Sequence, residues 1–97
     1  MQLVNIPNDA PKIGDLYISK NGVVFVVDDI IYSSKNRVWK VLLWSVLKFE
    51  FLPCELEEFH ESGLLYKRKI SPEEGNKYTL DKGYDCTKHI YLAMIDV

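Results

Sequence analysis

The sequence has little that would cross-link the chain or insert it into a membrane. Its 97 residues include only two cysteines, Cys54 and Cys86, which lie far apart and form no C-x-x-C pair. This usage predicts reduced thiols rather than a disulfide framework. No stretch approaches the roughly twenty apolar residues that a membrane helix needs, and the first residues carry no cationic leader. We therefore expect a protein of the cytoplasm that does not enter a membrane.

Positive charge is also scarce relative to negative charge. Twelve Lys and Arg residues stand against fourteen Asp and Glu residues, so the formal net charge is -2. The whole chain has no electrostatic reason to bind phosphate, and non-specific nucleic-acid binding is disfavoured. The sequence lacks a Gly-rich phosphate loop, a nucleophile elbow and an HExxH motif. We expect neither catalysis nor a bound cofactor.

Short apolar runs separated by turn residues predict a mainly β protein. DLYISK and VVFVVDDIIYS flank Asn21-Gly22, which is a strong signal for a hairpin closed by a type I′ turn. Polar residues 33–36 predict the next turn. Residues 37–51, RVWKVLLWSVLKFEF, predict a third strand that is broken near Ser45 by a bulge or a turn.

The second half of the chain begins with a predicted helix. From Cys54 onward, after Pro53, acidic residues crowd the first turns and Leu56 and Phe59 lie three apart, which predicts a two-turn helix that ends near residues 62–63. Residues 64–70 predict a strand. The polar stretch 71–88 has room for a small hairpin around residues 81–83, and residues 89–97, HIYLAMIDV, predict a final strand.

These elements predict a single domain, residues 1–97. The expected fold is a small SH3-like antiparallel barrel or a strongly bent sheet, with one short helix and a C-terminal added strand. The SH3-like core would span residues 11–70, and residues 71–97 would form an extension. Closure of the sheet would protect its edges from pairing with other chains.

The order KIGDLYISKNGVVFVVDDI, then a tryptophan-bearing strand, then FLPCELEEF resembles a group of small, uncharacterised phage and prophage proteins with SH3-like folds. In that group a Gly-Asp-x-Tyr or Phe opening leads to a glycine hairpin, and a proline-led helix ends in Glu-Phe. The resemblance implies that Gly14, Tyr17, Gly22 and Phe59 are turn and core positions. It also implies a phage-encoded protein in the host cytoplasm, and it carries over no catalytic residue. The tail after Ile70 lies outside it.

The third predicted strand is apolar on both faces. Its side chains fall into two sets by alternation: Val38, Leu42, Trp44 and Val46 on one side, and Trp39, Val41, Leu43 and Leu47 on the other. In one interpretation the helix around Phe59 and the final strand cover the second face within the chain. In the other, part of that face binds a protein partner or a second copy, because monomers seldom expose large apolar patches.

Four aromatic residues are the candidate binding residues of such an interface: Trp39, Trp44, Tyr32 and Phe49. Tryptophan and tyrosine are favoured at the centres of protein interfaces. We expect a non-enzymatic protein-binding module, of the kind a phage uses to inhibit or modulate a host factor or defence protein. The alternatives are a nucleic-acid-binding module of the KOW or Tudor type and a small structural component of a virion.

Two thiols and two imidazoles raise the question of zinc. They are Cys54, His60, Cys86 and His89, spaced as C-x5-H and C-x2-H. On one short helix, Cys54 and His60 would diverge by about 240°. Ordinary buried or surface residues are the preferred interpretation, and no metal is expected.

Three groups of charged residues have both a functional and an ordinary interpretation. Tyr66 with Lys67, Arg68 and Lys69 suits single-stranded nucleic acid, or else a solvated sheet edge. The acids Glu50, Glu55, Glu57, Glu58 and Glu61 suit a basic partner, or else a solvated helix face. The pairs Asp28-Asp29 and Asp81/Asp85 offer carboxylates for catalysis, although turns and strand ends account for them better. In each case the ordinary interpretation is preferred.

Overall fold

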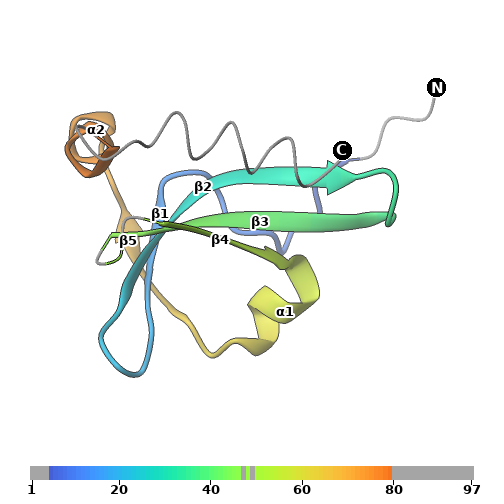
Figure 1. Cartoon of the computed structure of the whole chain (residues 1–97), viewed down its shortest axis with the longest axis horizontal. Helices are drawn as coiled ribbons and strands as arrows, with labels where there is room; N and C mark the ends of the chain where they lie inside the picture. Colours follow the sequence, from blue (N-terminus) through green and yellow to red (C-terminus); the bar gives the residue numbers. More distant parts are fainter. Residues whose placement is uncertain (1–4, 47, 49, 80–97) are drawn as a thin grey trace.

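The computed structural model describes residues 5–46, 48 and 50–79 (Figure 1). Five strands form one antiparallel sheet in the order β4-β3-β2-β1-β5. The strands are β1 (Asp15–Ile18), β2 (Val24–Ser33), β3 (Val38–Ser45), β4 (Glu50–Glu55) and β5 (Leu65–Lys69). The helices are α1 (Leu56–Glu61) and α2 (Pro72–Thr79). The prediction of a mainly β antiparallel fold is confirmed, but within the described residues β4 and β5 are free edges and the sheet does not close into a barrel.

The hairpin predicted at Asn21-Gly22 is present, but its turn type is not the predicted one. The Ser19 N–H donates to the Val23 carbonyl at 2.9 Å, and the Gly22 N–H donates to the Ser19 carbonyl at 3.0 Å. Only Gly22 has a positive φ, +81°, whereas a type I′ turn needs positive φ at Asn21 as well. The loop therefore has three residues with glycine in the left-handed position. The Ser19 Oγ accepts the Val23 N–H at 3.1 Å, which adds a bond that favours this pairing.

The hairpin of β2 and β3 contains a bulge that decides which way the end of β2 faces. Val27 pairs with Leu43 and Asp29 pairs with Leu42, so Asp28 is the extra residue. An extra residue reverses the side-chain alternation beyond it. Tyr32 consequently lies opposite Trp39, on the same face as Val27. The polar turn between these strands and the break after Ser45 are both confirmed.

The predicted helix starts two residues later than expected. Pro53 and Cys54 pair with Leu42 and Val41 as part of β4. Proline is acceptable there because β4 is an edge strand, where a missing N–H costs no ladder bond. The helix begins at Leu56, and the Glu55 N–H donates to Glu58 Oε1 at 3.1 Å in a capping box.

Two apolar clusters occupy opposite faces of the sheet. One contains Val27, Val41 and Leu43 with Phe59 of α1, and the other contains Leu42, Trp44 and Phe51. The residues Val41–Ser45 are all buried, so this part of β3 has no side chain in solvent. The predicted facing is confirmed for residues 41–44, as is the covering of one face by Phe59, and Leu47 lies outside the described residues. Both faces are enclosed at their centres, so the expected surplus of exposed apolar surface is not found there.

Gly14, Tyr17 and Phe59 lie at turn and packing positions around the first strand. Gly14 has a φ of +91°, donates its N–H to the Val27 carbonyl at 2.8 Å and accepts the Ile70 N–H at 2.9 Å. Tyr17 and Phe59 pack edge to face with ring centroids 5.0 Å apart. These positions thus hold the first strand against β2 and α1.

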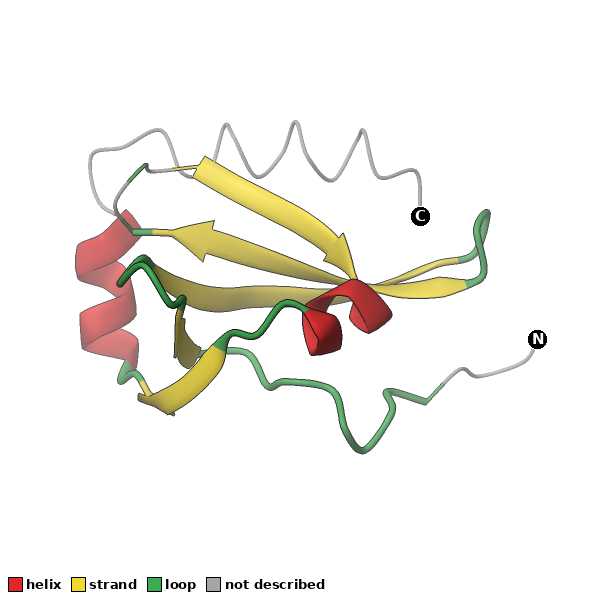
Figure 2. Ribbon diagram, turned by 90° about the horizontal axis from the view of Figure 1, so that it is seen from below, coloured by secondary structure: helices red, strands yellow, loops and turns green. Residues whose placement is uncertain are grey.

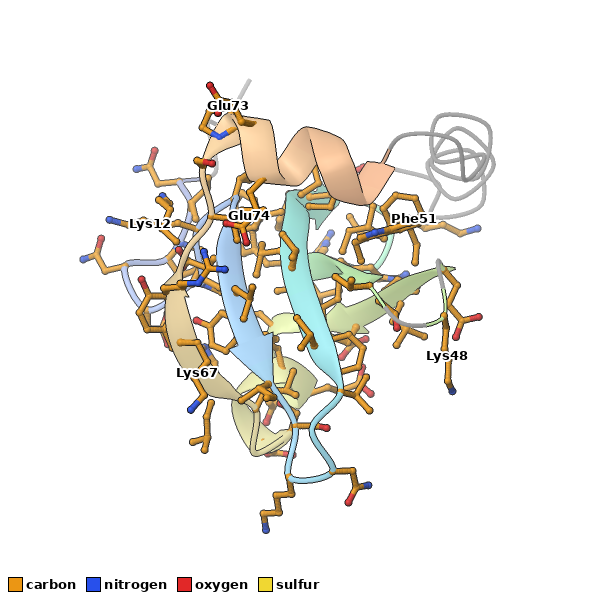
Figure 3. The ribbon with its side chains drawn as sticks, turned by 90° about the vertical axis from the view of Figure 1, so that its left-hand side faces the viewer. Lys12, Lys48, Phe51, Lys67, Glu73 and Glu74 are labelled. Atoms are coloured by element: carbon orange, nitrogen blue, oxygen red, sulfur yellow. The ribbon has the colours of Figure 1, made fainter. Side chains whose placement is uncertain are left out.

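The second helix, α2, was not predicted. The Ser71 Oγ accepts the Glu74 N–H at 3.1 Å, and Pro72 occupies the first helical position. Figures 1 and 3 show α2 and α1 on opposite sides of the sheet. Neither described helix has the length and apolar character that crossing a bilayer would require. The predicted hairpin at residues 81–83 and the predicted final strand lie outside the described residues.

Candidate functional site

A groove lies between the start of β3 and α1, and we call it the Trp39 groove. Its volume is about 370 Å³. The lining residues come from the strand, from the junction with β4 and from the helix: Val38, Trp39, Glu55, Leu56, Glu57, His60 and Glu61. Figure 2 shows α1 lying across the sheet on this side. Phe59 of the helix packs in the apolar cluster at the centre of this face, and Trp39 forms the strand side of the groove.

An aromatic pair forms the strand side of this region. Tyr32 and Trp39 are opposite residues of β2 and β3, and their rings meet edge to face with centroids 5.3 Å apart. Both side chains are partly exposed. A ring pair of this geometry contributes about 0.5–1.5 kcal/mol beyond its buried area, so Tyr32 holds Trp39 in place. The bulge at Asp28 allows Tyr32 and Trp39 to meet, because without it Tyr32 would face the other side of the sheet.

The helix side of the groove is acidic. Glu57 and Glu61 are exposed and four residues apart on α1, so they lie on one side of the helix beside the half-buried Glu55. Within the part of the chain that the structure describes, no Lys or Arg forms a salt bridge with any of these three carboxylates. His60 Nε2 lies 3.2 Å from Asp9 Oδ2, which brings a fourth carboxylate to the helix. The groove therefore combines an aromatic wall with three carboxylates that form no salt bridge with a described Lys or Arg.

The four predicted binding residues do not come together. Tyr32 and Trp39 are neighbours at the groove, whereas Trp44 lies on the opposite face of the sheet. Trp44 is 2% exposed and packs on Phe51 with ring centroids 4.7 Å apart. A side chain with so little exposed surface cannot contact a partner in this fold, so Trp44 is a core residue here. Phe49 lies outside the described residues.

Cys54 and His60, which were considered as zinc ligands, lie in different environments: Cys54 packs against the core and His60 lines the groove. Cys54 lies in β4, not on the predicted helix, and packs against the cluster of Val27 and Phe59. Burial, with a smaller contribution from the negative charge of Glu58, raises the pKa of the Cys54 thiol to about 11. The thiol is therefore protonated at neutral pH, which makes it a poor metal ligand and nucleophile. Among the described residues no three His, Cys, Asp or Glu side chains form a metal-binding group, and Cys86 and His89 lie outside them.

The basic run of β5 does not form one cationic face. The pairing of β1 with β5 shifts between Leu16 and Tyr17, so Lys67 has no partner across the strand and Figure 3 shows it directed outward. Arg68 donates two hydrogen bonds to the carboxylate of Glu74, one of them 2.6 Å long. A bulge and lysines on a free edge both discourage pairing with another strand. This arrangement agrees with a solvated sheet edge.

A second hollow, of about 490 Å³, lies against the N-terminal loop. It is lined mainly by residues 6–13, with Ile30 and Lys69 behind them. Ile6 and Ile13 are 55% and 60% exposed, so the loop offers apolar side chains but no aromatic ring and no carboxylate. This hollow lacks the combination of groups found in the Trp39 groove.

Sequence reasoning named the aromatic residues and the acidic helix as separate features and missed that they face each other. The available signal was the alternation of β3, which places Trp39 on the same side as Val41 and hence on the side of the helix. The bulge at Asp28, which brings in Tyr32, leaves no such signal. Comparisons with protein-family models, curated proteins and solved structures found no match for this chain.

Proposed function

We propose that this chain is a non-enzymatic protein-binding module that docks a partner on the Trp39 groove. The observation that carries the proposal is a partly exposed tryptophan, held by Tyr32, that forms one wall of a groove whose opposite wall is α1. Tryptophan and tyrosine are the residue types most enriched among those that dominate binding energy. The volume of the groove is within the range of sites that accept a side chain or a small molecule.

The kind of partner follows from the resemblance and the topology. The meander from β1 to β4, with β5 returning to pair with β1, supports an SH3-like classification. An SH3-like protein of phage origin, without catalytic machinery, would act by occupying a surface of a host factor or defence protein. On this proposal it is an inhibitor or a modulator that works in the host cytoplasm.

The proposal is tested by selecting peptides from a random displayed library against the immobilised protein. Peptides that bind through the groove will lose most of their affinity for Trp39→Ala and keep it for Leu65→Ala. Leu65 is the matched control, because it is 61% exposed on β5 and does not line the groove. If the selected peptides bind the two variants equally well, the partner docks elsewhere and the proposal is wrong.

Analytical ultracentrifugation of the free protein distinguishes between two kinds of partner, another protein and a second copy of this chain. A dimer that dissociates in Trp39→Ala and persists in Leu65→Ala would assign the groove to self-association. A monomer at all concentrations, together with Trp39-dependent peptides, would assign it to another protein.

A further inference from the structure

We infer that the partner presents a positively charged segment and that an arginine of this segment enters the Trp39 groove. The inference rests on the proposed function and adds the chemistry of the ligand. It is carried by the combination of an aromatic wall, an acidic wall without a salt bridge to a described Lys or Arg, and apolar lining residues in one groove.

The acidic wall is the first step of the argument. Glu57 and Glu61 are like charges four residues apart on a helix, an arrangement that weakens the helix. Glu55 adds a third negative charge to the lining, and no described Lys or Arg forms a salt bridge with these residues. A cation bound between them would remove this repulsion. An anionic segment, such as an acidic peptide or a nucleic acid, would add to it.

The aromatic wall selects the kind of cation. A cation within about 6 Å of a tryptophan ring is attracted by the negative face of the ring. The guanidinium of arginine is planar, stacks on aromatic rings and binds carboxylates through two parallel hydrogen bonds. The ammonium of lysine can use the charge but not this planar geometry. Trp39 on one side and Glu57 on the other therefore favour arginine.

The floor accommodates the rest of the side chain. Val38 and Leu56 are partly buried apolar residues of the lining. The three methylene groups of an arginine can cover them while the charged end reaches the carboxylates. The same groove would hold a neutral side chain of that length without ionic contacts, so charge selectivity is what separates this inference from docking in general.

The two tryptophans give the experiment an internal control. In a ¹⁵N-labelled sample each indole N–H gives its own signal, assigned with Trp39→Phe, and Trp44 reports on the opposite face. The probes are a short Gly/Ser peptide that carries two arginines, its citrulline counterpart, which keeps the shape without the charge, and its glutamate counterpart. The arginine peptide will shift the Trp39 signal and leave the Trp44 signal in place. The citrulline peptide will bind at least about tenfold more weakly than the arginine peptide.

Charge-neutral variants test the acidic wall. Glu57→Gln combined with Glu61→Gln will weaken binding of the arginine peptide about fivefold at low salt, and the difference will shrink as salt is added. Glu73→Gln is the matched control, because Glu73 is an exposed acid of α2 and does not line the groove. Circular dichroism of each variant verifies that it is folded.

Three results would overturn the inference. They are equal affinity for the arginine and citrulline peptides, unchanged affinity in the double glutamine variant, and a loss of affinity in Glu73→Gln as large as in that variant. If the citrulline peptide binds with the same affinity as the arginine peptide and shifts the signal of Trp39 but not that of Trp44, the inferred charge selectivity is wrong, and docking on the groove is still supported. If no peptide shifts Trp39, the inference is wrong, and the library selection decides separately whether docking occurs.

Discussion

The two tryptophans should separate cleanly into one residue for stability and one for binding. Trp44 is 2% exposed and lies in a cross-strand row with three other buried residues: Leu16, Val26 and Phe51. An aromatic side chain buries roughly 150–250 Å², and its complete removal from a core costs about 3–5 kcal/mol. The total free energy of unfolding of a domain of this size is about 5–15 kcal/mol. Trp44→Ala should therefore remove a large share of the stability.

Trp39→Ala should cost much less. Trp39 is partly exposed, and the contact that it loses is the ring pair with Tyr32, which corresponds to about 1 kcal/mol. In a domain of this length a change of 1 kcal/mol moves the melting temperature by about 4–8 °C. We expect Trp39→Ala to fold with a slightly lower melting temperature. Trp44→Ala should melt about 20 °C lower or fail to fold.

Urea unfolding followed by far-UV circular dichroism measures both effects, since it does not depend on the fluorescence of the residue that is removed. Trp44→Phe keeps a ring in the row and should cost about 1–2 kcal/mol, so it gives a value even if the alanine variant does not fold. Equal destabilisation by Trp39→Ala and Trp44→Ala, within about 0.5 kcal/mol, would refute the assignment of Trp44 to the core and of Trp39 to the surface.

Three further measurements address other parts of the fold. In a Cys86→Ser background the only thiol is Cys54, and because burial raises its pKa from 9.0 to about 11, iodoacetamide should react about a hundredfold more slowly at pH 8 with the folded than with the urea-unfolded chain. A reaction rate in the folded chain within tenfold of the rate in the unfolded chain would contradict this burial. The protonated thiol also contributes to the free energy of unfolding, fully below pH 9, and this contribution is lost as the pH rises toward 11. Gly22→Ala should cost about 1 kcal/mol in urea unfolding because φ is +81° although the space around the glycine is open. Gly22→Asn should cost less, and equal costs would argue against a backbone origin. Arg68→Met should cost under about 1 kcal/mol, with the cost vanishing at high salt and in a Glu74→Gln background, because the Arg68 side chain is about half exposed to solvent. A loss above about 2 kcal/mol would show that the pair does more than join two surface groups.

Within the described residues, the predictions that came from periodicity agree with the structure. Residues alternate across a strand, so the two faces of β3 followed directly from the order of Val41, Leu42, Leu43 and Trp44. The helix α1 followed from its acidic first turns and from Phe59. Its start was placed too early, because Pro53 also suits an edge strand and nothing in the local sequence shows that β4 would lie at an edge.

What the sequence did not reveal depends on single residues and on packing. The bulge at Asp28 adds one residue to an unbroken apolar strand and leaves no change in composition, so the side on which Tyr32 lies was not predictable. The helix α2 was overlooked because Gly75 and Asn76 have poor helix propensity, although Ser71 and Pro72 form an ordinary helix start.

The site was predictable only in part, for the same reason. Trp39 and Trp44 are equivalent in the sequence, since each lies on an apolar face of one strand. Trp39 lies beside the start of α1 and is partly exposed at the groove, whereas Trp44 lies in a row of buried residues. Exposure of a side chain depends on what lies above it in three dimensions. The candidate residues were therefore found as a group, and their division between core and groove required the structure.

The buried stretch Val41–Ser45 implies an uneven pace of evolution along this chain. Each of its side chains belongs to one packed face or the other, so genetic drift has almost no freedom there, because most exchanges at such positions cost more than a marginally stable domain tolerates. Glu57 and Glu61 beside Trp39 are exposed and carry no such packing constraint. A lineage descended from this protein would keep that pentapeptide as a mark of ancestry while its exposed acidic residues changed.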